Sequence, residues 1–179
     1  TLYVADVPGA ATATVPVARL KHAADWDPEP YAWERQARLF RRETSIALRP
    51  VAVEIERLTT KLAPFAHLTG TGAITLTDAQ VNALRNYVQS GGVLLIDPCG
   101  GSKPFNDSIR AQLLAKAFAD KPPAEIATDH PLLAGRGDGL TQIARPQVRP
   151  FVFRALGQKF PKLQILESGD RRLVTFGYS

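Results

Sequence analysis

The chain has 179 residues, 45% of them hydrophobic and 22% charged, which is the composition of an ordinary globular protein with one sizeable core. No run approaches the roughly 18 apolar residues of a membrane-spanning helix. The formal net charge is +5. The densest basic cluster is expected to be the solvated face of a helix rather than a nucleic-acid surface, because no aromatic residues are interleaved with it. That cluster consists of Arg35, Arg38, Arg41 and Arg42.

The beginning of the chain bears on its origin. It starts Thr1-Leu2-Tyr3 and contains no methionine, so we expect a fragment or processed piece of a longer protein from which a targeting signal can have been removed. Residues 1–14, rich in alanine and threonine around Pro8-Gly9, are predicted to be a lead-in or linker. Residues 15–179 are predicted to form a single α/β domain.

The first half of this domain is predicted to hold three strands and one helix. The strands are expected at residues 15–20, 50–55 and 65–69. The helix is expected from about residue 31 to 44, because Trp33, Ala37 and Phe40 fall on one face of it. Pro30 stands where the first turn of a helix tolerates proline.

The segment that follows carries the clearest local signals. Thr77 and Gln80 have the spacing of a capping box at the start of a helix predicted over residues 77–90. Gly91-Gly92 supplies the left-handed stop of that helix. The run at residues 93–96 is apolar without alternation, which predicts a strand covered on both faces in the interior of a parallel sheet.

The last third is less regular. A helix is predicted at residues 107–119 and a strand at 148–153. Residues 163–166 and 173–178 are expected to pair as a hairpin. Strands that alternate with helices indicate βαβ units, so the predicted fold is α/β with a mainly parallel sheet and helices on both faces.

Polar residues and glycines gather after three predicted strands, at the edge where ligands bind in open parallel sheets. The residues predicted to line a pocket there are Lys21, Asp25, Trp26, Asp27, Thr69, Gly70, Thr71, Gly72, Asp97, Gly100, Gly101 and Ser102. Charged groups, glycine N–H groups and an aromatic ring suit a small polar or anionic ligand, or a partner segment. The structural alternative is that these residues cap helices, as Asp27 can, and close tight turns.

A catalytic role is the second hypothesis. Cys99 follows a buried strand and precedes two glycines and a helix, a place where a helix N-terminus can activate a thiolate nucleophile. With His130 as its base, the chain would be a small hydrolase or amidohydrolase. A thiol packed at a crowded turn is the favoured alternative, because no base is located beside Cys99. A non-catalytic binding or interaction module is therefore the leading prediction.

No metal site and no cofactor are predicted. Potential metal ligands are His22, His67, His130, Asp25, Asp27 and Asp97. No pair of them has a metal-binding spacing such as HExxH, and the single cysteine excludes a CxxC site and an internal disulfide. His67 lies inside an apolar strand, where a hydrogen-bonded core histidine is expected. Residues 69–72 match neither the Walker A nor the GxGxxG pattern.

Short motifs form a recognisable set over residues 15–179. They are Ala18-Arg19-Leu20-Lys21, Trp26-Asp27-Pro28, His67-Leu68-Thr69-Gly70-Thr71-Gly72, Leu84-Arg85-Asn86-Tyr87-Val88 with Gly91-Gly92, Asp97 with Gly100-Gly101-Ser102, Asp129-His130-Pro131 and Val174-Thr175-Phe176-Gly177-Tyr178-Ser179. As a set, they resemble the bacterial domain of unknown function 4159 family, which is grouped with class I glutamine-amidotransferase-like folds and trehalose-utilisation-like proteins.

This resemblance implies a flavodoxin-like three-layer sandwich. It also implies a domain that often belongs to a longer bacterial protein, frequently exported or membrane-linked. No activity is established for the family, so none is carried over. Glutaminases of this fold class place their cysteine in a Gly-x-Cys-x-Gly turn, whereas this chain reads Asp97-Pro98-Cys99-Gly100-Gly101 and has no later His-x-Glu. We therefore expect no glutaminase activity.

Overall fold

The computed structural model describes residues 9–127, 129–131, 154, 163–168 and 171–176. Its elements in chain order are β1 (Ala13–Lys21), α1 (Ala32–Thr44), β2 (Ile46–Glu54), the 3₁₀ turn η1 (Ile55–Arg57), β3 (Phe65–Gly70), α2 (Asp78–Gln89), β4 (Val93–Pro98), the 3₁₀ turn η2 (Cys99–Gly101), α3 (Lys103–Ile109), the π-helical turn η3 (Arg110–Leu114), α4 (Ala115–Ala117), β5 (Ala124–Glu125), β6 (Leu163–Ser168) and β7 (Arg171–Phe176).

The strands form one seven-stranded sheet in the order β2-β1-β3-β4-β7-β6-β5. The pairs from β2 to β7 are parallel, while β6 runs antiparallel to both β7 and β5. The sheet is therefore mainly parallel, as the alternation of strands and helices predicted. The order β2-β1-β3-β4 is consistent with a flavodoxin-like fold. The prediction that the apolar run 93–96 lies inside the sheet is confirmed, because β4 pairs with β3 and β7.

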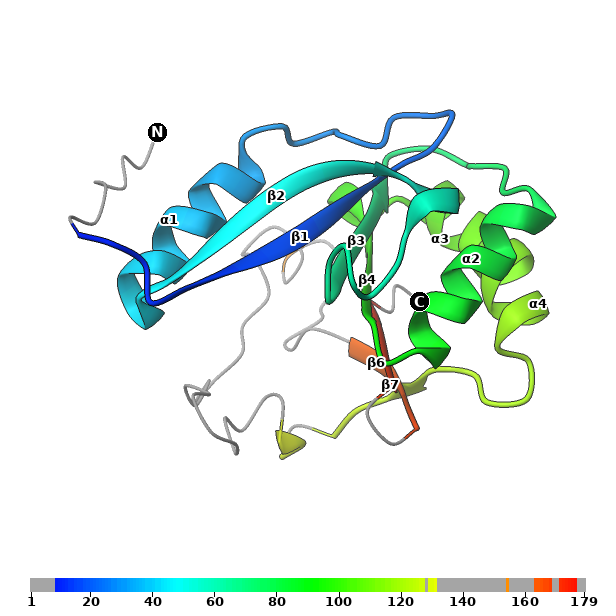
Figure 1. Cartoon of the computed structure of the whole chain (residues 1–179). Helices are drawn as coiled ribbons and strands as arrows, with labels where there is room; N and C mark the ends of the chain where they lie inside the picture. The colour runs from blue at the N-terminus through cyan, green and yellow to red at the C-terminus, as the bar shows by residue number, and fades with distance from the viewer. Residues whose placement is uncertain (1–8, 128, 132–153, 155–162, 169–170, 177–179) are drawn as a thin grey trace.

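Two layers of helices flank the sheet (Figure 1), with α1 on one side and α2, α3 and α4 on the other. The main core lies on the second side. The most deeply buried strand residues in it are Ala18, Leu20, Ala66, Leu68, Leu94 and Ile96, each below 2% exposed. They occupy every second position of β1, β3 and β4, as the two-residue period of a strand requires. The alternate positions of these strands face α1, in which no residue is buried.

β1 and β7 each begin two residues earlier than predicted, so that β1 takes in Ala13 and Thr14 of the predicted lead-in. Two other elements begin four residues earlier than predicted. β2 begins at Ile46, directly after Ser45 ends α1 in a left-handed conformation with φ 61°. Pro50 lies inside β2 rather than at its start, which is tolerated because β2 is an edge strand. The helix predicted from residue 107 begins at Lys103, because the Ser102 hydroxyl accepts a hydrogen bond from the Phe105 N–H at 3.3 Å.

Two local predictions are confirmed. The Thr77 hydroxyl accepts from the Gln80 N–H at 3.2 Å, and the Gln80 side chain accepts from the Thr77 N–H at 3.1 Å, which completes the capping box. β6 and β7 pair as an antiparallel hairpin in which Ser168 stands opposite Arg171. The strand predicted at residues 148–153 lies outside the described residues. Within the part of the chain that the structure describes, no helix is long and apolar enough to cross a membrane.

Candidate functional site

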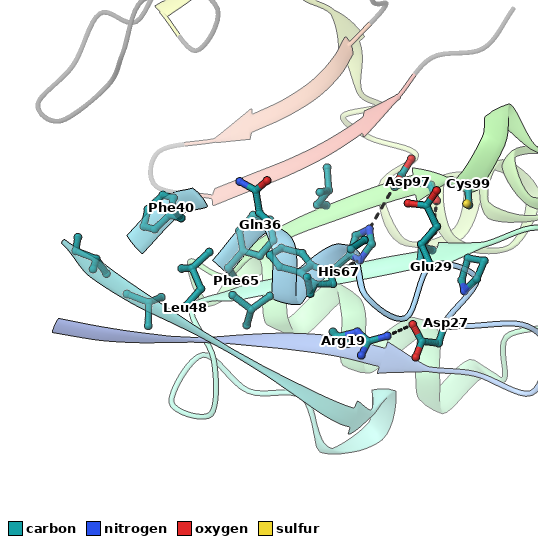
Figure 2. A pocket seen from close by; sticks show the side chains of 18 residues that line it. Arg19, Asp27, Glu29, Gln36, Phe40, Leu48, Phe65, His67, Asp97 and Cys99 are labelled. Atoms are coloured by element: carbon teal, nitrogen blue, oxygen red, sulfur yellow. Dashed lines mark hydrogen bonds and ion pairs between the residues drawn. The ribbon is translucent and has the colours of Figure 1, made fainter. Parts of the chain in front are cut away.

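A cavity of about 640 Å³ lies between α1 and the face of the sheet opposite the main core (Figure 2). Its walls are mostly apolar and include Trp33 and Phe40 from α1 and Phe65 from β3. Apart from Gln36 of α1, its polar residues cluster toward the carboxyl ends of the strands. They are Arg19, Asp27, Glu29, His67, Thr69, Asp97 and Cys99.

Strand register explains why these polar residues meet. Arg19 of β1 stands opposite His67 of β3, and Thr69 of β3 stands opposite Asp97 of β4. The chain continues from β1 to β2 on one side, whereas β3 lies on the other side of β1. The border between β1 and β3 is therefore the switch point of the sheet, beyond which open α/β sheets bind their ligands. Arg19 and His67 flank that border.

Arg19 is the cation that the described lining supplies. Its guanidinium forms an ion pair with the Asp27 carboxylate (Figure 2). The Trp26 ring covers it, with its centroid 5.3 Å from the guanidinium carbon. Burial lowers the pKa of Arg19 from its ordinary value, and the Glu34 carboxylate opposes that shift. An arginine stays charged at neutral pH, so Arg19 and Asp27 are a fixed ion pair in the wall of the cavity.

A hydrogen bond from Trp33 fixes the orientation of the His67 ring. The Trp33 indole N–H donates to His67 Nδ1 at 3.0 Å, and the two rings meet edge to face with centroids 5.4 Å apart. Because an indole nitrogen can only donate, Nδ1 is the acceptor, and a neutral His67 carries its proton on Nε2. That nitrogen faces Asp97 Oδ2 at 3.8 Å. His67 is thus hydrogen-bonded, as predicted, but it lies in the cavity wall rather than the closed core.

His22 has a structural role. It is buried, its Nε2 lies 2.8 Å from the Thr69 carbonyl oxygen, and its Nδ1 accepts from the Ala24 N–H at 3.3 Å. Both ring nitrogens are therefore engaged by the backbone. Nε2 is the donor in this arrangement, because a carbonyl oxygen only accepts. His22 fastens the loop after β1 to the end of β3.

Hydroxyl groups join the three predicted loops to one another. The Thr69 hydroxyl donates to the Asp97 carbonyl at 2.7 Å, and the Thr71 hydroxyl donates to Asp25 Oδ2 at 2.9 Å. The Ser102 hydroxyl donates to the Thr71 carbonyl at 2.7 Å. These bonds satisfy polar groups inside the scaffold. They favour the structural interpretation for Asp25, Thr71 and Ser102.

The glycines of these loops differ in what they do. A Cβ at Gly70 would lie 2.6 Å from the ring of the buried Phe105, so Gly70 lets β3 pack against α3. Gly100 and Gly101 have φ of 64° and 77°, a left-handed conformation that turns the chain sharply after Cys99. A Cβ at Gly72 would meet nothing within 4 Å.

Five of the residues singled out from the sequence as candidate ligand-binding, catalytic or metal-binding residues line the cavity together: Asp27, His67, Thr69, Asp97 and Cys99. The other predicted pocket residues do not line it: Lys21, Asp25, Trp26, Gly70, Thr71, Gly72, Gly100, Gly101 and Ser102. Lys21 instead pairs with Glu54 on the neighbouring strand β2. Arg19, Glu29 and Trp33 also line the cavity, although they were not predicted to do so. A signal for Arg19 was available, because it follows Val15 and Val17 at alternate positions on one face of β1.

Cys99 and His130 are not brought together. His130 Nε2 lies 3.5 Å from Glu167 Oε2, and Glu167 is in register with Arg172, which pairs with Val93 at the start of β4. Cys99 comes six residues after Val93, beyond the other end of that strand. At about 3.3 Å per residue, the two ends are roughly 20 Å apart. The register thus gives the Cys99 thiol no hydrogen-bonding contact with the His130 ring.

The candidate metal ligands do not converge on one point. Over the described ranges, no group of three or more histidine, cysteine, aspartate or glutamate side chains lies close enough to hold a metal ion. The carboxylates of Asp25 and Asp27 are instead engaged by Thr71 and Arg19.

Comparison with known proteins connects this arrangement to one family. A family model described as a domain of unknown function, DUF4159, matches residues 16–178. No curated protein matches the chain. The matched span includes every described strand position from Pro16 onward and all the lining residues of the polar end. The chain is a member of the DUF4159 family of domains of unknown function.

Proposed function

We propose that this domain is a non-catalytic binding module with a glutamine-amidotransferase-like fold, and that it holds a small organic ligand between α1 and the sheet. One observation carries the proposal. The register pair Arg19 and His67 flanks the β1/β3 switch point in the wall of a 640 Å³ cavity. This is where open α/β sheets bind their ligands.

The cavity has the character of a small-molecule site. Its volume lies within the usual range of about 300–1,000 Å³ for such sites. Apolar side chains form most of its wall, and a few polar groups gather at one end. Both polar anchors are already fixed in orientation, Arg19 by Asp27 and His67 by Trp33. A ligand that binds there would meet a prearranged surface and lose little affinity to ordering side chains.

The proposal is tested by a thermal-shift screen of small amines, carboxylates, sugars and nucleosides. A ligand at ten times its Kd stabilises the folded state by about 1.4 kcal/mol, which raises Tm by roughly 3 °C in a domain of this size. Ala32→Phe places a ring in the cavity and should abolish the shift. Arg35→Phe adds the same ring on the exposed side of α1 and should keep it. A shift that survives Ala32→Phe would place the ligand elsewhere.

A small hydrolase or amidohydrolase that uses Cys99 is the second candidate, because Cys99 lines this cavity in the turn after β4. The binding-module proposal predicts that iodoacetamide labels Cys99 no faster than a simple thiol at pH 7. An activated thiolate would react much faster, because reactivity follows the thiolate fraction. Labelling more than about tenfold faster than glutathione would favour the hydrolase.

A further inference from the structure

We propose that the cavity selects a ligand with an apolar body and a positively charged amine head, a choice that rests on the binding function proposed above. The proposal rests on the net charge of the residues at the polar end of the cavity. The charged residues of the described lining are Arg19, Asp27, Glu29 and Asp97. Since Arg19 and Asp27 neutralise each other, two carboxylates remain, in a chain whose formal net charge is +5.

The two remaining carboxylates have no lysine or arginine partner among the described residues. Glu29 comes from the turn before α1 and Asp97 from the end of β4, and Figure 2 shows both side chains at the same end of the cavity. The Nε2 atom of His67 lies 3.8 Å from Asp97 Oδ2. Both carboxylates would attract an ammonium group bound at this end of the cavity.

The apolar wall of the cavity favours a ligand whose body, apart from the amine head, is apolar. Trp33, Phe40 and Phe65 present aromatic rings, and the hydrogen bond to His67 fixes the Trp33 ring. Such rings attract a cation at their faces and bury the hydrocarbon part of an amine. A bare metal ion is a poorer occupant, because no cluster of three metal-ligating side chains exists in the described part of the chain.

An anionic ligand, which the sequence also allowed, meets a different environment. The cation of the described lining is Arg19. Its guanidinium already forms an ion pair with Asp27 and stacks on the Trp26 ring. An anion would have to compete with Asp27 for Arg19 while approaching Glu29 and Asp97. Each of those carboxylates would repel it. The same end of the cavity therefore discriminates between the two signs of charge.

Three probes with one body separate these cases: 4-phenylbutylammonium, 4-phenylbutanoate and 4-phenylbutan-1-ol. Each is titrated calorimetrically into the protein at pH 7. We expect the amine to bind at least about tenfold more tightly than the carboxylate, as a charge-assisted contact implies. Glu29→Gln and Asp97→Asn should each weaken the amine about fivefold and leave the alcohol unchanged. Glu43→Gln, which removes a charge at the far end of α1, should change neither.

The outcomes distinguish this proposal from the function on which it rests. If all three probes bind equally and Ala32→Phe abolishes their binding, the amine preference is overturned and the binding function stands. Tightest binding of the carboxylate also overturns the preference and restores an anionic ligand. If no probe binds, or if Ala32→Phe leaves binding intact, the binding function at this cavity fails as well.

Discussion

Gly70 lies at the end of β3 with its Cα against the Phe105 ring. In Gly70→Ala, the new Cβ would lie 2.6 Å and 2.7 Å from two ring carbons of a fully buried residue. We expect this overpacking to lower the free energy of unfolding by about 1–3 kcal/mol, measured by urea denaturation. Gly72→Ala, two residues later, meets nothing within 4 Å and should change it by less than about 0.5 kcal/mol. Equal effects of the two substitutions would contradict this account of Gly70.

Tyr87 predicts a loss of stability at alkaline pH. Its hydroxyl is buried and donates to the Ala63 carbonyl at 3.0 Å, and burial raises the pKa of Tyr87 above its ordinary value of 10.0. Above pH 10 the unfolded chain releases this proton while the folded protein keeps it. The unfolded state then binds fewer protons, so the free energy of unfolding falls as pH rises, by up to about 1.4 kcal/mol per pH unit.

The Tyr87→Phe variant isolates this contribution. At pH 8 it should be less stable than the parent by about 1 kcal/mol, because the Ala63 carbonyl loses its partner. Between pH 8 and pH 11 it should lose about 1.4 kcal/mol less than the parent does. Other alkaline groups are common to both proteins and cancel in the comparison. An identical alkaline loss in both would show that Tyr87 does not ionise on unfolding.

The start of α2 depends on one side chain pair. Thr77→Ala removes the hydroxyl that accepts from the Gln80 N–H and should lower the free energy of unfolding by about 1 kcal/mol. Thr77→Ser keeps the hydroxyl and should stay within about 0.5 kcal/mol of the parent. Both values come from urea denaturation at pH 7. If Thr77→Ser proves as destabilising as Thr77→Ala, packing of the methyl group rather than capping holds this end.

Elements with local signals were predictable, and those set by distant contacts were not. The capping box and the paired glycines fixed α2, because each acts through groups within a few residues. β2 extends back to Ile46 because it pairs with β1 from Ala13 onward, a contact across 33 residues that no local pattern records. Likewise, the sequence alone identifies Trp33 only as one of the apolar residues of a predicted helix. Its bond to His67 exists only once α1 packs on β3.

At the scale of the molecule, strand order decides which polar residues share a site. The sequence showed which residues follow each strand, and the structure gathers Asp27, Thr69 and Asp97 from that set. Lys21 pairs instead with Glu54, which stands opposite it in the register of β1 and β2. The switch point is a property of the assembled order β2-β1-β3. Arg19 and His67 therefore acquire their place only through tertiary structure.

The fluorescence of Trp33 tests the central claim most directly, because its ring lines the cavity proposed to bind the ligand. The chain has two tryptophans, so Trp26→Phe leaves Trp33 as the only reporter and keeps an aromatic face for Arg19. The measurement is acrylamide quenching of Trp33 with and without a saturating ligand from the thermal-shift screen. A ligand in the cavity should at least halve the quenching constant. An unchanged constant at saturation would place the ligand elsewhere and contradict the account.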